Sequence, residues 1–290
     1  MRLGLVICSA GRPEALGALL MRLRSQSAPA DLLVLSVTGP ADLPEGLVPP
    51  DAIICTGPPG LAAQRNRALD ALRGQVEIVA FFDDDYLPAH DALDGIRRGF
   101  RAFPEASGLT GRLLADGIGS GGLDRAKAEA LLDRDASPRN RPRALARRLV
   151  GLYGCNMAFR MDAVGTTRFD EALPLYGWQE DVDFAARVPG EKLATDAFSG
   201  VHLGLRSGRE TRGLALGYSQ LANPAYLWRK GSLPLGFALR LMLRSVLANH
   251  LRALRPEPWI DRVARARGNR RALVDLLRGT AAPGRILDLR

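Results

Sequence analysis

Three consecutive aspartates, Asp83, Asp84 and Asp85, directly follow the apolar run IVAFF. A short, almost wholly apolar run predicts a buried strand, so these carboxylates stand at its carboxyl end. Ligands of open α/β sheets bind at that edge. Two carboxylates two residues apart can face one cation, and Mg²⁺ and Mn²⁺ prefer carboxylate and phosphate oxygens. The triplet therefore predicts a clamp for a metal and a diphosphate. The alternative, a solvated acidic turn, is less favoured because the preceding strand is so apolar.

Strand-like and helical segments alternate in the first third of the chain, a pattern typical of a parallel sheet with crossover helices. The expected strands are Leu3–Cys8, Leu32–Val37, Ala52–Cys55 and Val76–Phe82, and the expected helices are Pro13–Ser25 and Leu61–Leu72. This arrangement would carry the aspartates at the end of a central strand.

The remaining two thirds are less regular. Residues 116–148 are rich in Gly, Asp and Arg and predict loops and short helices. The further expected elements are a strand at Tyr153–Arg160 and helices at Glu180–Val188, Leu233–Leu254 and Ala272–Leu277. We expect a catalytic domain over 1–225, with a nucleotide-binding half at 1–115 and an acceptor half at 116–225, and a helical extension over 226–290.

Composition narrows the class of protein. The 290 residues are 47% hydrophobic, enough for one large α/β domain with an appendage. The net charge of +9 favours a polyanionic partner such as nucleic acid, anionic lipid or a phosphorylated substrate. The three cysteines show no paired spacing, and the N-terminus lacks the features of a signal peptide. We therefore expect a cytoplasmic protein.

Six segments in fixed order resemble those of the family 2 glycosyltransferases, and the resemblance covers most of the chain. They are VICSAGRPEAL, GLAAQRNRAL, FFDDDYLP, GCNMAFR, RFDEALPLYGWQEDVDFAAR and FSGVHLG. The resemblance implies an α/β protein with a single Rossmann-like nucleotide-binding domain, a mixed, mostly parallel central sheet (the A-type glycosyltransferase fold) and a C-terminal helical extension. It also implies transfer of a sugar from a nucleotide-diphosphate sugar to a glycan or lipid-linked glycan, in cell-surface polysaccharide biosynthesis.

The resemblance also implies a metal site for Mn²⁺ or Mg²⁺. Asp83 and Asp85 match the family's D-x-D pair, with Asp83 near the ribose or the metal and Asp85 on the metal, and Asp84 takes the middle position beside the nucleotide. His202 matches a late metal-binding histidine. A structural role for this lone histidine is the alternative.

Asp181 matches the catalytic base of the family, and Glu180 precedes it. An acceptor hydroxyl needs such a group, because it is a poor nucleophile until a carboxylate takes its proton. The two acids also suit the first turn of a helix, and that structural role does not exclude catalysis.

Nucleotide contacts are expected from the loop after the first strand and from the QRN segment. The residues are Ser9, Ala10, Gly11, Arg12, Arg65 and Asn66. Asn66 has a structural alternative, hydrogen bonding to nearby backbone. Many relatives carry an acidic residue at the end of the second strand to hold the base, whereas this chain offers only Asp42, further along.

Two residues are expected on the sugar or acceptor side. Asn156 can bond a sugar hydroxyl, and the Trp178 ring can stack on an apolar sugar face. Core positions are the alternative for both.

The helix expected at Leu233–Leu254 is basic and amphipathic, with Arg240, Arg244 and Arg252 among apolar residues. Such a helix suits peripheral contact with the inner face of an anionic membrane, where a lipid-linked acceptor would be met. Packing on the main domain is the alternative.

Two other functions compete. A sugar nucleotidyltransferase also uses strand-end carboxylates and a metal, but it would carry a longer glycine-rich activation loop than SAGRP. The hypothesis of a basic nucleic-acid-binding protein is supported by the net charge alone. Because no recognition motif accompanies the charge, we expect no nucleic-acid partner.

Overall fold

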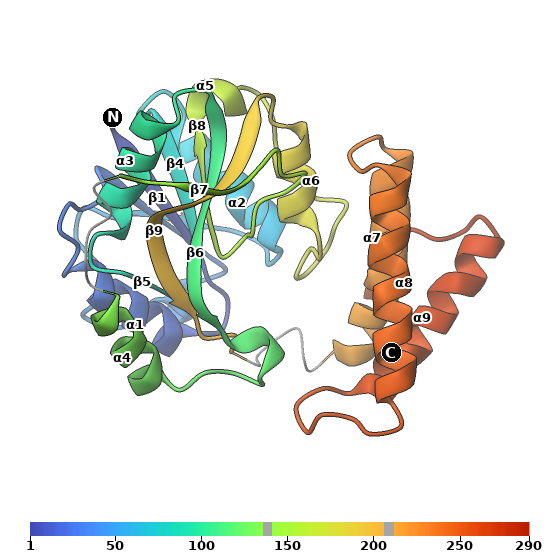
Figure 1. Cartoon of the computed structure of the whole chain (residues 1–290). Coiled ribbons are helices and arrows are strands. Elements are labelled where there is room, and N and C mark those ends of the chain that lie inside the picture. The colour runs from blue at the N-terminus through green and yellow to red at the C-terminus, as the bar shows by residue number, and fades with distance from the viewer. Residues whose placement is uncertain (136–140, 206–211, 290) are drawn as a thin grey trace. The chain divides into compact units, whose positions relative to one another are not determined.

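The computed structural model describes residues 1–135, 141–205 and 212–289, and the chain divides into two compact units (Figure 1). The sheet unit consists of Met1–Pro59, Ala63–Phe169 and Val188–Leu205. The helical unit consists of Gly60–Ala62, Asp170–Arg187 and Arg206–Arg290.

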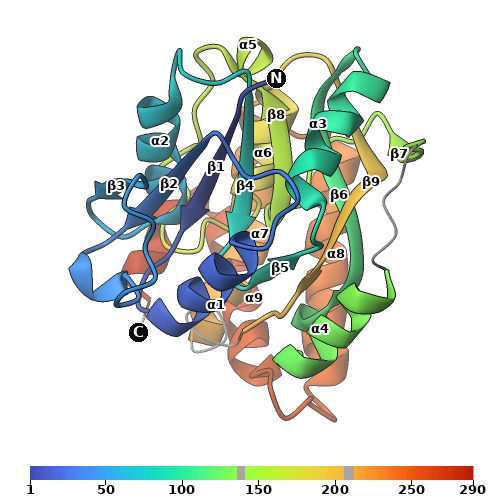
Figure 2. The ribbon, with the colours of Figure 1, turned by 90° about the vertical axis from the view of Figure 1, so that its left-hand side faces the viewer.

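The sheet unit is built on one mixed sheet whose strand order is β3-β2-β1-β4-β8-β6-β9-β5, with β7 also paired to β9 (Figure 2). The strands are β1 (Leu3–Cys8), β2 (Leu32–Val37), β3 (Ile53–Thr56), β4 (Ile78–Asp83), β5 (Tyr86–Pro88), β6 (Ala106–Asp116), β7 (Ala144–Arg147), β8 (Asn156–Arg160) and β9 (Glu191–His202). Strands β1, β2, β3, β4, β6 and β9 run in one direction, and β5, β7 and β8 run in the other. The predicted mixed, mostly parallel sheet is therefore confirmed.

Helices of the sheet unit cover both faces of the sheet. They are α1 (Pro13–Leu23), α2 (Leu61–Leu72), α3 (Ala92–Ala102), α4 (Arg125–Arg134) and α5 (Met161–Val164), with short 3₁₀ turns η1 (Pro40–Asp42) and η2 (Gly117–Gly119). Apolar residues of α1 and α3 form one buried cluster with β1 and β4. On the opposite face, Gly4 of β1 lies so close to Leu72 of α2 that an added Cβ would approach it to 2.7 Å. Burial on both faces explains why these strands are nearly continuous apolar runs.

The helical unit contains α6 (Glu180–Arg187), α7 (Gly213–Arg229), α8 (Leu235–Arg252), α9 (Arg262–Leu277) and the 3₁₀ turn η4 (Pro283–Leu287). Helices α7 and α9 touch backbone to backbone. A Cβ at Gly217 would lie 2.1 Å from the Arg265 carbonyl oxygen, and one at Gly268 would lie 2.2 Å from that of Leu214. Only glycine permits this approach.

Buried amides join the three long helices. The Asn249 Nδ2 donates to Gln220 at 2.7 Å and to Asn269 at 2.9 Å, and the Asn269 Nδ2 donates to the Gly217 carbonyl oxygen at 2.6 Å. These bonds satisfy polar groups that would otherwise be costly to bury, and they fix which faces of α8 and α9 meet α7.

The sequence located several elements closely. Strands β1 and β2 and helix α2 have the predicted bounds, and α8 falls within its predicted range. Helix α9 is longer than expected. Gly268 and the arginines around it weaken the helical pattern in the sequence, so the first part of the helix was missed. In the structure Gly268 allows α9 to pack closely on α7. The domain boundary predicted at 225 lies inside α7. Across the described residues, none of the helices has the length and apolarity needed to cross a bilayer.

Candidate active site

The polar centre of the sheet unit lies where β4, β6 and β9 end. Asp83 is the last residue of β4, Asp116 of β6 and His202 of β9. His202 is in register with Asp116 on one side and with Tyr86 on the other. Because Asp85 immediately precedes Tyr86, the pairing of β5 with β9 brings Asp85 next to His202. The Asp85 Oδ1 lies 3.3 Å from the His202 Nε2.

Asp83, Asp85 and His202 can each direct one ligand atom to a shared point, with those atoms all within 4.8 Å of one another. Two carboxylates and an imidazole form a donor set for a divalent cation. Asp85 and His202 are nearly fully buried, whereas Asp83 is partly exposed. The three residues that the D-x-D and GVHLG motifs predicted are therefore together, and they fit a metal ion.

Asp116, which sequence reasoning missed, holds the other side of the His202 ring. Its Oδ1 lies 3.0 Å from the His202 Nδ1, and its Oδ2 accepts a hydrogen bond from the Tyr153 hydroxyl at 2.9 Å. A carboxylate on one ring nitrogen orients the other nitrogen, as metal-binding histidines usually require. Asp116 thus turns the Nε2 of His202 towards Asp85.

The charges of this cluster shift its pKa values. Burial alone would lower the pKa of His202, but the hydrogen bonds to Asp116 and Asp85 outweigh it and raise the pKa to about 10. Burial acts to raise the pKa of Asp85 and Asp116, yet their bonds to His202 dominate and hold both pKa values below the usual range. The two carboxylates therefore favour the protonated imidazole, whereas metal binding requires its neutral form.

Asp84 faces the loop that follows β1. Its carboxylate accepts a hydrogen bond from the Ser9 hydroxyl at 2.7 Å and pairs with the Arg12 guanidinium at 2.5 Å. Burial raises the pKa of Asp84 to about 7, with Arg12 opposing the rise and Asp85 adding to it. The Arg12 guanidinium also lies 3.7 Å from Asp85. Ser9 and Arg12 are therefore beside the carboxylates, and their contacts with a nucleotide stay a prediction.

The chain turns sharply after His202 and returns to the aspartates. Gly204 has a φ of +65°, and the next residue, Leu205, donates its backbone N–H to the Asp85 Oδ2 at 2.8 Å. A left-handed residue is needed at that point, which explains the glycine of GVHLG.

Ala10 and Gly11 are exposed at the tip of the loop, and Asp42 fixes it from behind. The Asp42 carboxylate accepts hydrogen bonds from the backbone N–H groups of Gly11 and Thr38, both at 2.7 Å. Asp42 therefore connects the ends of β1 and β2, and both of its carboxylate oxygens accept hydrogen bonds from backbone N–H groups.

Arg65 on α2 is buried beneath the aspartates. Its guanidinium pairs with Asp83 at 3.0 Å, donates to the Gly154 carbonyl oxygen at 3.0 Å and packs on the rings of Phe81 and Phe169. It thus sets the position of Asp83. Its predicted contact with the nucleotide stays a prediction.

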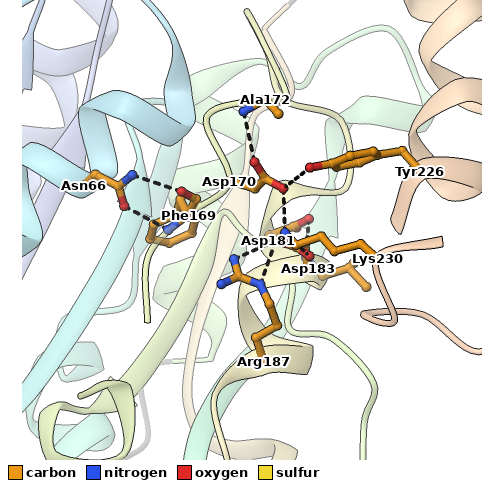
Figure 3. Close-up of polar contacts among 10 residues, drawn as sticks. Asn66, Phe169, Asp170, Ala172, Asp181, Asp183, Arg187, Tyr226 and Lys230 are labelled. Atoms are coloured by element: carbon orange, nitrogen blue, oxygen red, sulfur yellow. Dashed lines mark hydrogen bonds and ion pairs between the residues drawn. The ribbon is translucent and has the colours of Figure 1, made fainter. Parts of the chain in front are cut away.

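Two predicted site amides bond within the fold. Asn66 exchanges two hydrogen bonds with the backbone of Phe169, at 3.0 and 2.8 Å (Figure 3). Asn156 is fully buried, accepts from the Thr110 hydroxyl at 2.6 Å and donates to the Gly111 carbonyl oxygen at 3.2 Å. Both amides thus join chain segments, and their contacts with a donor remain predictions.

Glu180, Asp181 and Trp178 belong to the helical unit. Glu180 and Asp181 open α6, where the helix dipole favours acids, with Glu180 buried and Asp181 half-buried. The turn before them is strained, because Leu175 and Gln179 have φ values of +60° and +74°. Such backbone strain is common at functional turns.

A network of ion pairs within the helical unit holds α6 to α7 (Figure 3). The Lys230 Nζ lies 2.5 Å from the Asp170 carboxylate and 3.0 Å from that of Asp183. Asp183, fully buried, also pairs with Arg187 at 2.6 Å, and the Tyr226 hydroxyl donates to Asp170 at 2.8 Å. Helix α7 thereby fixes the turn and the helix that carry Asp181. Of this network, only the Asp183–Arg187 pair has a signal in the sequence, the four-residue spacing typical of ion pairs on a helix.

No protein-family model and no curated protein matches the chain. Solved structures do. The chain is similar to the mannosyltransferase PcManGT from Pyrobaculum calidifontis, solved with GDP-Man and Mn²⁺, at a TM-score of 0.54 and 16% identity over 99% of this chain and 85% of that one. It is also similar to S. aureus TarS, at a TM-score of 0.50 and 13% identity over 94% of this chain, which spans 55% of that protein. With its mixed sheet and its strand-end carboxylates, the chain has the A-type glycosyltransferase fold.

Proposed function

We propose that this protein is an inverting, divalent-metal-dependent glycosyltransferase of the family 2 type. The observation that carries the proposal is the convergence of Asp83, Asp85 and His202 at the ends of β4 and β9. In the reaction, the acceptor hydroxyl oxygen bonds to the anomeric carbon, and the bond from that carbon to the diphosphate breaks. The products are the glycoside, the nucleoside diphosphate and a proton.

We assign binding of the donor diphosphate to a metal ion on the strand-end carboxylates and to Arg12. Asp83, Asp85 and His202 would hold Mn²⁺ or Mg²⁺, which neutralises charge on the departing diphosphate. The Arg12 guanidinium, already beside Asp84, adds paired donors for phosphate oxygens. Ala10 and Gly11 leave the loop tip open for the nucleoside.

Asp181 is assigned as the general base that takes the proton of the acceptor hydroxyl. Its half-buried carboxylate at the start of α6 follows a strained turn and stands on a helix held by Lys230. Glu180 supports that helix start. No separate acid is needed for the leaving group, because the diphosphate leaves as a stabilised anion.

The acceptor is assigned as a glycan or lipid-linked glycan of cell-surface polysaccharide biosynthesis. The half-buried Trp178, whose carbonyl oxygen accepts from Asn223 at 2.8 Å, offers an aromatic face for a sugar ring. Peripheral contact with the inner face of the membrane is proposed on separate grounds, the surface of α8.

The experiment is a thermal-shift panel of UDP, GDP, dTDP and CMP sugars with Mn²⁺, Mg²⁺ or EDTA. A donor that binds only the folded protein at about a hundred times its Kd should raise Tm by about 5 °C or more, and only with metal. Asp85→Ala should lose that shift, and Asp51→Ala, which changes an exposed carboxylate outside the site, should keep it. An equal shift in EDTA would contradict the proposal.

The products of turnover distinguish a glycosyltransferase from a sugar nucleotidyltransferase. A sugar nucleotidyltransferase would release pyrophosphate from a nucleoside triphosphate and a sugar phosphate. We expect release of nucleoside diphosphate from a nucleotide sugar and no pyrophosphate. Pyrophosphate release that depends on Asp85 would favour the nucleotidyltransferase.

A further inference from the structure

Helix α8 presents a row of exposed leucines. Leucines recur at every fourth position of the helix and are 46–65% exposed, at Leu235, Leu239, Leu243, Leu247 and Leu251. Sixteen residues of α-helix span about 24 Å, so the row runs nearly the full length of α8. Contiguous apolar surface of this kind marks an interaction site.

Among the residues that the structure describes, the core of the helical unit does not use this row. Ala238 and Asn249 are the buried residues of α8, and Met242 and Val246 pack against the apolar cluster shared with α7 and α9. The amide bonds from Asn249 to Gln220 and Asn269 hold that face inward. The leucines therefore lie outside this packed face, and because each four-residue step turns about 40°, the row winds about 160° around the exposed part of α8.

The charges beside the leucines are all positive. Arg240 and Arg244 each follow an exposed leucine by one residue, about 100° around the helix, and both are exposed. The sequence from 211 to 256 contains no Asp or Glu. Arg252, at the end of α8, pairs with Glu257 at 2.7 Å, so the positive edge of the helix rests on Arg240 and Arg244. An apolar face with a basic edge and no acid matches the boundary between acyl chains and anionic headgroups.

We propose that the leucine row of α8 docks on an anionic lipid surface, with Arg240 and Arg244 at the headgroups. A second copy of the chain fits less well, because a twofold contact through α8 would bring arginines together with no carboxylate to pair them. A nucleic acid would use the arginines and leave the leucines in water. In this arrangement α8 lies in the plane of the interface.

The experiment is flotation of the full chain with vesicles of phosphatidylcholine alone or mixed with phosphatidylglycerol. We expect binding to the mixed vesicles that weakens as salt rises. L243Q should weaken binding about tenfold, because a leucine leaves the apolar phase. R240Q with R244Q should weaken it about 25-fold, at about fivefold per arginine, and reduce the salt dependence.

Matched controls come from the sheet unit. L145Q changes an exposed leucine of β7, and R101Q changes an exposed arginine of α3. Both should bind vesicles as the parent chain does. Binding of L243Q at the parental level would overturn the proposal. So would a dimer in sedimentation equilibrium that L243Q dissociates, which would assign the row to a second copy.

The inference stands apart from the proposed reaction. All four variants should keep the metal-dependent thermal shift with a nucleotide sugar, because none changes the strand-end site. Vesicle binding without any nucleotide shift would contradict the reaction and leave the lipid surface in place. A thermal shift with a nucleotide sugar but no vesicle binding would contradict the lipid surface and leave the proposed reaction in place.

Discussion

The His202 Nδ1 lies 3.0 Å from the Asp116 Oδ1, a bond between the last residues of the adjacent parallel strands β9 and β6. The bond fixes the plane of the imidazole and directs its Nε2 towards Asp85 at 3.3 Å. Asp116 is therefore a positioning residue for the proposed metal site.

Asp116→Ala should weaken Mn²⁺ binding by about 10- to 100-fold, the usual effect of removing a carboxylate behind a metal-binding histidine. Calorimetric titration with Mn²⁺ in the presence of a nucleoside diphosphate measures the change. Asp51→Ala, an exposed acid before β3, serves as the control. Unchanged affinity in a folded Asp116→Ala protein would remove Asp116 from the site.

Asp181→Asn should leave the Kd of the donor nearly unchanged and lower kcat by about a hundredfold or more, the scale on which a general base contributes. The measurement combines nucleotide-sugar titration with acceptor-dependent release of nucleoside diphosphate. Glu171→Gln, an exposed acid earlier in the same segment, should behave as the parent. Full activity in Asp181→Asn would refute the assignment.

Lys230→Gln should lower kcat more than it changes the donor Kd, because Lys230 holds the helix that carries Asp181. It should also destabilise the protein by about 1–3 kcal/mol, since the buried Asp183 loses one of its two cationic partners. Lys230→Arg should restore part of kcat. Arg229→Gln, which changes the exposed neighbour on α7, is the control. If Lys230→Gln loses the expected stability but keeps the parental kcat, the role of Lys230 is purely structural.

Asp42→Asn should cost about 1–3 kcal/mol of unfolding free energy near neutral pH, because charged hydrogen bonds to Gly11 and Thr38 are lost. Burial acts to raise the pKa of Asp42, but the hydrogen bonds from Thr38 and Gly11 outweigh it and lower the pKa. A lowered folded pKa gives stability that is present above the unfolded pKa of about 4 and is lost as pH falls through the folded value. Urea unfolding between pH 3 and 7 should show the gap between parent and variant closing below about pH 4. A gap that persists undiminished at pH 3 would contradict this role.

Elements with a strong local pattern were predicted closely. Strand β1 is buried at every position and is nearly all apolar, so its bounds follow from hydropathy alone. Helix α2 follows a break at Gly57–Gly60 and carries helical periodicity, which fixes both of its ends. The apolar strand before Asp83 likewise sufficed to put the D-x-D pair at a strand end.

Elements that depend on distant partners were not predicted. Strand β9 contains charged residues and a glycine, and it becomes a strand by pairing with β5, β6 and β7. Asp116 lies in a stretch rich in glycine and charge, and its role arises only from the parallel register that puts it opposite His202. Single-sequence patterns carry no information on such register, so Asp116 and the Lys230 network required the structure.

The hydrogen bond from Leu205 to Asp85 joins positions 120 residues apart in the chain. Contacts of such high sequence separation form late, because a long loop must close before they contribute any stability. During synthesis Asp83 and Asp85 are therefore made well before His202, and during refolding a long loop must close to bring them together. The appearance of manganese affinity in a refolding experiment should accordingly mark the final strand insertion rather than the initial collapse.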